Sequence, residues 1–236
     1  MNVDELLREV EADPSTLGLV LHGSRAGGAE RPGSDYDLVR VVTDEEYARR
    51  EPDLHVKDGT TDVVFQTPAR LRRLVDEQGW YTSLFLSARV LADKTGEVGE
   101  LVQAIVDAAN EAAYAAVAAE YDGYLNSWVR SLKAWGKGDE LGGRLHAANS
   151  SGYLVRALFG LEHRWAPYLD QLDPALPEIE RAQGWEDGYL RAALLRLLGD
   201  GDPGFQRELE ARVEALMDAR GFAHEWGGDL EPLKSP

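Results

Sequence analysis

The sequence contains no cysteine among its 236 residues. A disulfide framework, a thiolate zinc site and a cysteine nucleophile are therefore excluded. It also has no run approaching the roughly 18 apolar residues of a membrane span, and its acidic start, MNVDE, differs from the basic start of a secretory signal. We expect a cytoplasmic protein that makes no use of a membrane.

Basic residues are few compared with acidic ones, 25 Lys and Arg against 42 Asp and Glu, and the formal net charge is -17. Proteins that bind nucleic acid neutralise its phosphates with a basic stripe, which this sequence does not show. The composition therefore disfavours a nucleic-acid partner. The acidic surface either serves solubility alone or attracts a cationic substrate, and charge by itself does not decide between these two.

Short strand and helix patterns alternate in the first part of the chain, as expected for a small mixed sheet with helices packed against it. Strand signals end near Gly96, and alanine- and leucine-rich helical patterns follow. We therefore predict an α+β protein with a sheet domain at 1–96 and a helical bundle domain at 97–236. The predicted strands are 17–21, 37–42, 54–57, 61–66 and 88–92, and the predicted helices are 3–12, one from Thr67, 97–109, 111–136, 140–163, 178–199 with a break near Gly184, and 203–220.

Three local signals refine this outline. Thr43 and Glu46 have the spacing of a capping box, in which each side chain bonds the backbone N–H of the other residue. Asp58-Gly59 lies between two strand patterns and suits a tight hairpin, because both residues tolerate positive φ. Gly221, after the last helical pattern, predicts a helix C-cap.

The segment from Gly23 to Asp37 lies between two predicted strands and contains the first candidate site residues. Gly23-Ser24 directly follows a strand, so the chain turns where a missing side chain lets backbone N–H groups approach a phosphate, and the serine hydroxyl adds a donor. Arg25 is a further candidate phosphate contact, although an arginine that is merely exposed is the more common case.

Asp35 and Asp37 are separated by one residue at the start of a predicted strand, and alternation points both side chains to the same face. Two carboxylates this close repel each other unless a cation lies between them. Mg²⁺ suits them, since it takes oxygen ligands and is commonly shared with substrate phosphates. Asp62 begins another strand pattern, and an isolated aspartate there is most simply a strand-end residue. Beside the acidic pair, it is the third ligand of a predicted site for two metal ions.

The pattern of Gly23-Ser24, ten intervening residues, Asp35-Tyr36-Asp37 and a strand headed by Asp62 resembles the signature of the polymerase-β-like nucleotidyltransferase superfamily. The fuller match, with Arg25-Ala26 after the turn, resembles especially its small bacterial members, which include the aminoglycoside and lincosamide nucleotidyltransferases. The resemblance covers about residues 17–66. It implies a minimal mixed sheet with flanking helices, and transfer of a nucleoside monophosphate from a nucleoside triphosphate with release of pyrophosphate.

The resemblance also implies roles for the site residues. Gly23 and Ser24 would hold the triphosphate. Asp35 and Asp37 would bind both Mg²⁺ ions, and Asp62 would bind the catalytic ion near the acceptor hydroxyl. The acceptor would be a small molecule, such as an aminoglycoside antibiotic.

Two alternatives stay open. An antitoxin-like nucleotidyltransferase would modify a protein or an RNA, but such proteins are shorter and leave the helical domain to a partner chain. A module that binds nucleotide without reaction would have little need of three clustered acids. The preferred nucleotide, the acceptor, a general base and the oligomeric state, including a homodimer, are not fixed by the sequence. Aromatic residues of the second half are expected mainly in the core, with some lining an acceptor pocket: Trp128, Trp135, Tyr153, Phe159, Trp165 and Tyr168.

Overall fold

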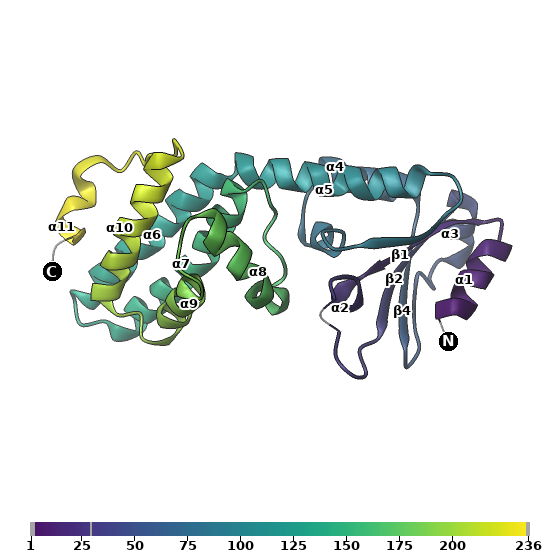
Figure 1. The fold of residues 1–236 in the computed structure, drawn as a ribbon, viewed down its shortest axis with the longest axis horizontal. Coiled ribbons are helices and arrows are strands. Elements are labelled where there is room, and N and C mark those ends of the chain that lie inside the picture. Colours follow the sequence, from purple (N-terminus) through teal and green to yellow (C-terminus); the bar gives the residue numbers. More distant parts are fainter. Residues whose placement is uncertain (1–2, 29, 235–236) are drawn as a thin grey trace. The chain divides into compact units, whose positions relative to one another are not determined.

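The protein is described from a computed structural model, which covers residues 3–28 and 30–234 (Figure 1). The chain forms two compact units, Met1–Ala109 and Asn110–Pro236. The first unit contains a five-stranded sheet, and the described part of the second consists of helices and connecting turns. The predicted α+β class is therefore confirmed. The division into units falls within α5 (Glu97–Ala115), and the domain limit expected near Gly96 stays a prediction.

The sheet is mixed, with the strand order β3-β4-β2-β1-β5. Its central strand β2 is antiparallel to β1 and parallel to β4, while β3 and β5 pair antiparallel at the two edges. Each strand lies within one residue of its predicted bounds. The strands are β1 (Thr16–His22), β2 (Tyr36–Val42), β3 (His55–Lys57), β4 (Thr61–Gln66) and β5 (Arg89–Asp93).

Successive residues of β1 and β2 point alternately to opposite sides of the sheet. Because both strands are mostly apolar, each face of the sheet has a buried core. One face packs on helix α1 (Val3–Ala12), and its core contains Leu6, Val10, Leu19, Leu21, Leu38 and Val42. The other face packs on α4 (Pro68–Asp76) and the first turns of α5, and its core contains Val20, Val39, Val41, Leu71, Val98 and Ile105. The three short elements of this unit are α2 (Gly23–Ala26), α3 (Asp44–Arg50) and the 3-10 turn Trp80–Leu84.

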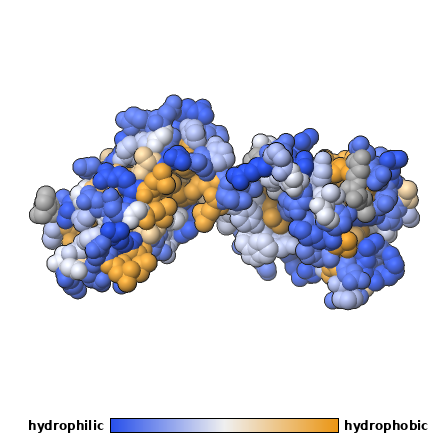
Figure 2. Space-filling view, turned by 90° about the horizontal axis from the view of Figure 1, so that it is seen from below, coloured by the Kyte–Doolittle hydropathy of each residue, from blue (hydrophilic) through white to orange (hydrophobic). Residues whose placement is uncertain are grey.

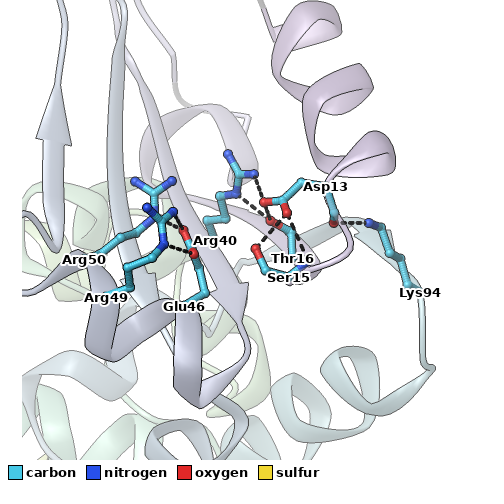
Figure 3. Close-up of polar contacts among 8 residues, drawn as sticks. All are labelled: Asp13, Ser15, Thr16, Arg40, Glu46, Arg49, Arg50 and Lys94. Carbon is cyan, nitrogen blue, oxygen red and sulfur yellow. Dashed lines mark hydrogen bonds and ion pairs between the residues drawn. The ribbon is translucent and has the colours of Figure 1, made fainter.

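The predicted capping box at α3 is only half formed. The Thr43 hydroxyl accepts the Glu46 N–H, as expected. The Glu46 carboxylate, however, accepts hydrogen bonds from Arg49 and Arg50 (Figure 3), and the Thr43 N–H donates to the carbonyl of Ser15. The predicted return bond from Glu46 is therefore wrong, since two charged guanidinium donors compete for its oxygens.

The predicted β3–β4 hairpin is confirmed, but its turn has another conformation than expected. Neither Asp58 nor Gly59 has positive φ. Instead, the Asp58 carboxylate accepts the backbone N–H groups of Thr60 and Thr61, and the Asp58 N–H donates to the carbonyl of Thr61. A side chain that mimics a backbone turn removes the need for positive φ.

A polar network holds together the end of the sheet where β1 begins (Figure 3). The buried Arg40 of β2 donates hydrogen bonds to the Thr16 hydroxyl and to the Asp13 carboxylate, each with a length of 2.8 Å. Asp13 also accepts hydrogen bonds from Ser15, and its carbonyl accepts one from Lys94. Burial works against ionisation of Asp13, but these hydrogen bonds and the Arg40 charge hold its pKa well below the usual range. The network ties α1, β1 and β2 together.

The helical unit is built on the packed pair α6 and α7, and its core buries Tyr121, Tyr124, Trp128 and Phe159. Gly221 follows α10 with φ of +82°, as its predicted capping role requires. The helix α8 begins at Leu169, although helix was predicted only from residue 178. No helix in the described residues is long and apolar enough to cross a membrane. The helices are α6 (Val117–Trp135), α7 (Glu140–Leu161), α8 (Leu169–Ala182), α9 (Tyr189–Gly199), α10 (Pro203–Ala219), the 3-10 turn Gly227–Asp229 and α11 (Glu231–Lys234).

Candidate functional site

A row of polar residues crosses the sheet unit at one register. Asp37 in β2 lies opposite Asp62 in the parallel strand β4. The register continues to His22 in β1 on one side and to Lys57 in β3 on the other. Residues directly opposite each other on neighbouring strands point to the same face of a sheet. Four strands therefore bring these side chains together. Asp35, the residue directly before β2, lies next to them.

The three predicted carboxylates form one cluster. One carboxylate oxygen from each of Asp35, Asp37 and Asp62 lies within 4.8 Å of the others. Burial, and then the negative charges of Asp35 and Asp62, raise the pKa of Asp37 above its ordinary value. Three carboxylate oxygens at this spacing are the donor set that a hard divalent cation takes. The cluster thus fits Mg²⁺ in both ligand chemistry and reach.

Gly23 has no side chain, and the Asp37 carboxylate occupies the space that a side chain would fill. Its φ is +71°, a conformation that other residues adopt only with strain, and a Cβ at this position would collide with an Asp37 carboxylate oxygen. The chain turns there into the single helical turn α2, closed by the hydrogen bond from the Gly27 N–H to the Gly23 carbonyl. Gly23 therefore lies directly beside the Asp37 carboxylate, and Ser24 follows it in the chain. Their contact with a phosphate stays a prediction.

Arg25 anchors the loop that carries Asp35. Its Nε and Nη2 donate to the carbonyl of Ser34 at 3.1 and 2.7 Å, and Nε also donates to the carbonyl of Asp35 at 3.1 Å. The guanidinium lies 4.1 Å from the centre of the Tyr36 ring. Arg25 is thus a positioning residue for the first carboxylate, and a direct contact with phosphate stays a prediction.

Two basic side chains from the edge strand β3 contact the carboxylates, and the sequence did not single them out. Lys57 Nζ donates to Asp35 Oδ2 at 3.1 Å and to Asp62 Oδ2 at 2.9 Å. His55 Nε2 lies 2.5 Å from Asp62 Oδ1. Burial opposes the ionisation of Asp62, but these two partners hold its pKa below the ordinary value. The predicted two-residue turn at Asp58-Gly59 would pair Lys57 with Thr60, so the hairpin pattern did not predict the observed register, in which Lys57 lies opposite Asp62.

His22 closes the other end of the row. Its Nδ1 is buried and has no hydrogen-bond partner within the described parts of the chain. Burial lowers the pKa of His22, against the pull of the Asp62 charge. His22 is the last residue of β1, one residue beyond the predicted strand 17–21, and its ring adds a neutral, unsatisfied nitrogen to this row.

The helical unit has a cavity of about 580 Å³. Small residues of α7 leave the space empty, and the walls include Trp165 and Leu172. Its charged lining groups form an ion pair, with Arg156 Nε 2.8 Å from Glu120 Oε2. Figure 2 shows hydrophobic residues gathered on the face of this unit that it presents. The exposed leucines of the unit are Leu141, Leu145, Leu169, Leu195 and Leu198.

Comparison with known proteins adds little to this geometry. No protein-family model matches the sequence, and no curated protein matches it. Among solved structures, the chain is similar to a nucleotidyltransferase-like protein from Exiguobacterium sibiricum 255-15, with 12% sequence identity, a TM-score of 0.40, and coverage of 98% of this chain and 86% of that chain. A likeness this distant carries no argument, so the functional assignment rests on the residues of the site.

Proposed function

We propose that this protein is a metal-dependent nucleotidyltransferase that transfers a nucleoside monophosphate from a nucleoside triphosphate to a hydroxyl group of a small molecule. The observation that carries the proposal is the convergence of Asp35, Asp37 and Asp62 beside the turn at Gly23. Carboxylates grouped next to an open backbone turn suit a substrate that brings both phosphates and metal ions.

The residues of the site have distinct tasks in this reaction. Asp35, Asp37 and Asp62 would hold two Mg²⁺ ions, which when bound neutralise charge on the attacking and leaving oxygens. The Gly23-Ser24 turn supplies N–H and hydroxyl donors to the triphosphate. Arg25 holds the Asp35 loop in place through the Ser34 and Asp35 carbonyls. Catalysis of phosphoryl transfer consists mainly of such positioning and neutralisation.

The bond changes balance with these groups alone. The acceptor oxygen forms a bond to the α-phosphorus while the bond from that phosphorus to the bridging oxygen of the β-phosphate breaks. Pyrophosphate leaves, and the acceptor's proton passes to solvent. No redox step or further co-substrate is required.

A small cationic acceptor fits the protein best. The net charge of -17 favours a cation over a polyanion such as RNA. The cavity of about 580 Å³ in the helical unit falls within the usual size range of small-ligand sites, roughly 300 to 1,000 Å³. Aminoglycosides, which carry both ammonium and hydroxyl groups, are therefore the first acceptors to test.

The test is product formation by the full chain with each nucleoside triphosphate, Mg²⁺, and a panel of aminoglycosides and lincosamides. Pyrophosphate release and the mass of the modified acceptor are measured together. We expect the double variant Asp35→Asn with Asp37→Asn to lose turnover. Asp44→Asn, an exposed aspartate at the start of α3, is the matched control and should keep it. Turnover that survives in the double variant would contradict the proposal.

A further inference from the structure

We propose that Lys57 is a built-in cation of the carboxylate cluster. In the nucleotide-free protein its ammonium group takes the place of one of the two divalent ions, so the protein alone binds one ion and accepts a second only when Lys57 moves away. This inference rests on the proposed function, because it requires the cluster to bind metal.

The position of the ammonium group carries the inference. Lys57 Nζ bridges two carboxylates, with Asp35 Oδ2 at 3.1 Å and Asp62 Oδ2 at 2.9 Å. Asp35 and Asp62 come from different segments of the chain, and a cation shared between such oxygens is what a bridging metal ion would otherwise supply. The register of the β3–β4 hairpin fixes this placement, since Lys57 lies directly opposite Asp62.

Asp62 has no carboxylate oxygen left without a basic partner. Lys57 contacts Oδ2, and His55 Nε2 lies 2.5 Å from Oδ1. A divalent ion that takes Asp62 as a ligand must therefore replace at least one of these two side chains. Lys57 contacts Asp35 through Oδ2. An ion that binds Asp37 and Asp35 Oδ1 therefore does not have to displace the ammonium group.

The charges of the cluster lead to the same stoichiometry. Three ionised carboxylates carry -3, and the ammonium group of Lys57 reduces this to -2, which one divalent ion neutralises. A second divalent ion within about 4 Å of the ammonium group would be repelled by it, and such repulsion corresponds to roughly tenfold or more in affinity even in a water-like medium. The negative triphosphate of a bound nucleotide would offset this repulsion, so the second ion would arrive with the substrate.

Lys57 is also free to leave. Its side chain is 57% exposed, and β3 is an edge strand of three exposed residues. Strands with few buried contacts open at low cost, and the lysine stem is flexible. The cation can therefore move out without disturbing the core of the sheet unit.

The experiment measures Mn²⁺ binding to the full chain without nucleotide, by calorimetry and by the electron-spin signal of free Mn²⁺. We expect one ion for the wild type. Lys57→Met should bind two ions, or bind the first at least tenfold more tightly. Lys57→Arg keeps the charge and should resemble the wild type. The matched control is Lys94→Met, which removes an exposed lysine whose Nζ bonds the Asp13 carbonyl, and its Mn²⁺ binding should not change.

The outcomes separate this inference from the proposed function. Unchanged or weaker Mn²⁺ binding by Lys57→Met, or two ions bound by the wild type, would overturn the role of Lys57 alone. Absence of Mn²⁺ binding by the wild type, or binding that persists after Asp35→Asn with Asp37→Asn, would overturn the metal site itself. Thermal unfolding of each variant checks that it is folded, and Lys57→Gln replaces Lys57→Met if the latter is not.

Discussion

Glu210 makes the stability of the helical unit depend on pH. It lies in α10 with only 1% of its surface exposed, and the Tyr121 hydroxyl donates a hydrogen bond to its Oε1 at a distance of 3.4 Å. Its Oε2 has no hydrogen-bond partner within the described chain. Burial, aided by the nearby charge of Glu214, raises the pKa of Glu210 to about 8. The folded protein therefore holds this carboxyl protonated at neutral pH.

The sign and size of the effect follow from proton linkage. The unfolded chain loses the Glu210 proton near its ordinary pKa of 4.5, whereas the folded chain keeps it up to a pKa of about 8. Between these values the folded state binds more protons, so the free energy of unfolding falls as pH rises. Each pH unit in this window corresponds to about 1.4 kcal/mol. We expect Glu210 to lower stability by roughly 3 to 5 kcal/mol between pH 4 and pH 9.

Glu210→Gln removes the titration and keeps the shape of the side chain. Urea unfolding of the wild type and of the variant at several pH values from 5 to 9 tests the effect through tryptophan fluorescence, since Trp128 Nε1 donates to the Gln206 carbonyl in the same core. The two proteins should be similar in stability near pH 5, and the variant should be more stable by several kcal/mol at pH 9. A difference between them that stays constant across this range would refute the reasoning.

Three further changes test the sheet unit. Gly23→Ala forces a side chain into positive φ and against Asp37, so we expect a loss of about 1 to 2 kcal/mol in urea unfolding and weaker Mn²⁺ binding by calorimetry. Arg25→Met frees the loop before β2, so Mn²⁺ affinity should fall while the unfolding midpoint changes little. Asp13→Asn leaves the buried Arg40 without its counterion and should cost about 2 to 3 kcal/mol at pH 7. Because the folded pKa of Asp13 is depressed, this difference should shrink as pH falls below 4.

The sequence predicted the carboxylate cluster because strand alternation is a local rule. Asp35 and Asp37 point to one face of a strand whatever its neighbours are. Asp62 was different, since its place beside Asp37 depends on the parallel pairing of β2 and β4, for which the sequence had no direct signal. The contact of Arg25 with the Ser34 carbonyl could not be predicted from the sequence either, because it forms only when the loop folds back.

The start of α8 shows another limit of local patterns. Pro174 and Pro177 lie inside this helix, and proline removes a backbone donor and clashes with the preceding turn. Local propensity therefore argued against helix before residue 178. Contacts that no local pattern reveals favour the helix nonetheless, since Leu176 and Ile179 are buried in the core of the helical unit.

The sheet order is the physical reason why the proposed exchange of cations would involve the edge strand β3. Asp37 lies in the central strand β2, which is paired with β1 on one side and with β4 on the other, so the sheet fixes its backbone on both sides. Asp62 depends on β4, and on its outer side β4 has only β3, three exposed residues at the edge of the sheet. Lys57 is the last residue of that strand. Under the proposal for Lys57, a cation that displaces its ammonium group would break only an exposed edge contact and would leave the half-buried Asp37 carboxylate in place. One site would then hold an ammonium group before substrate binds and a metal ion afterwards.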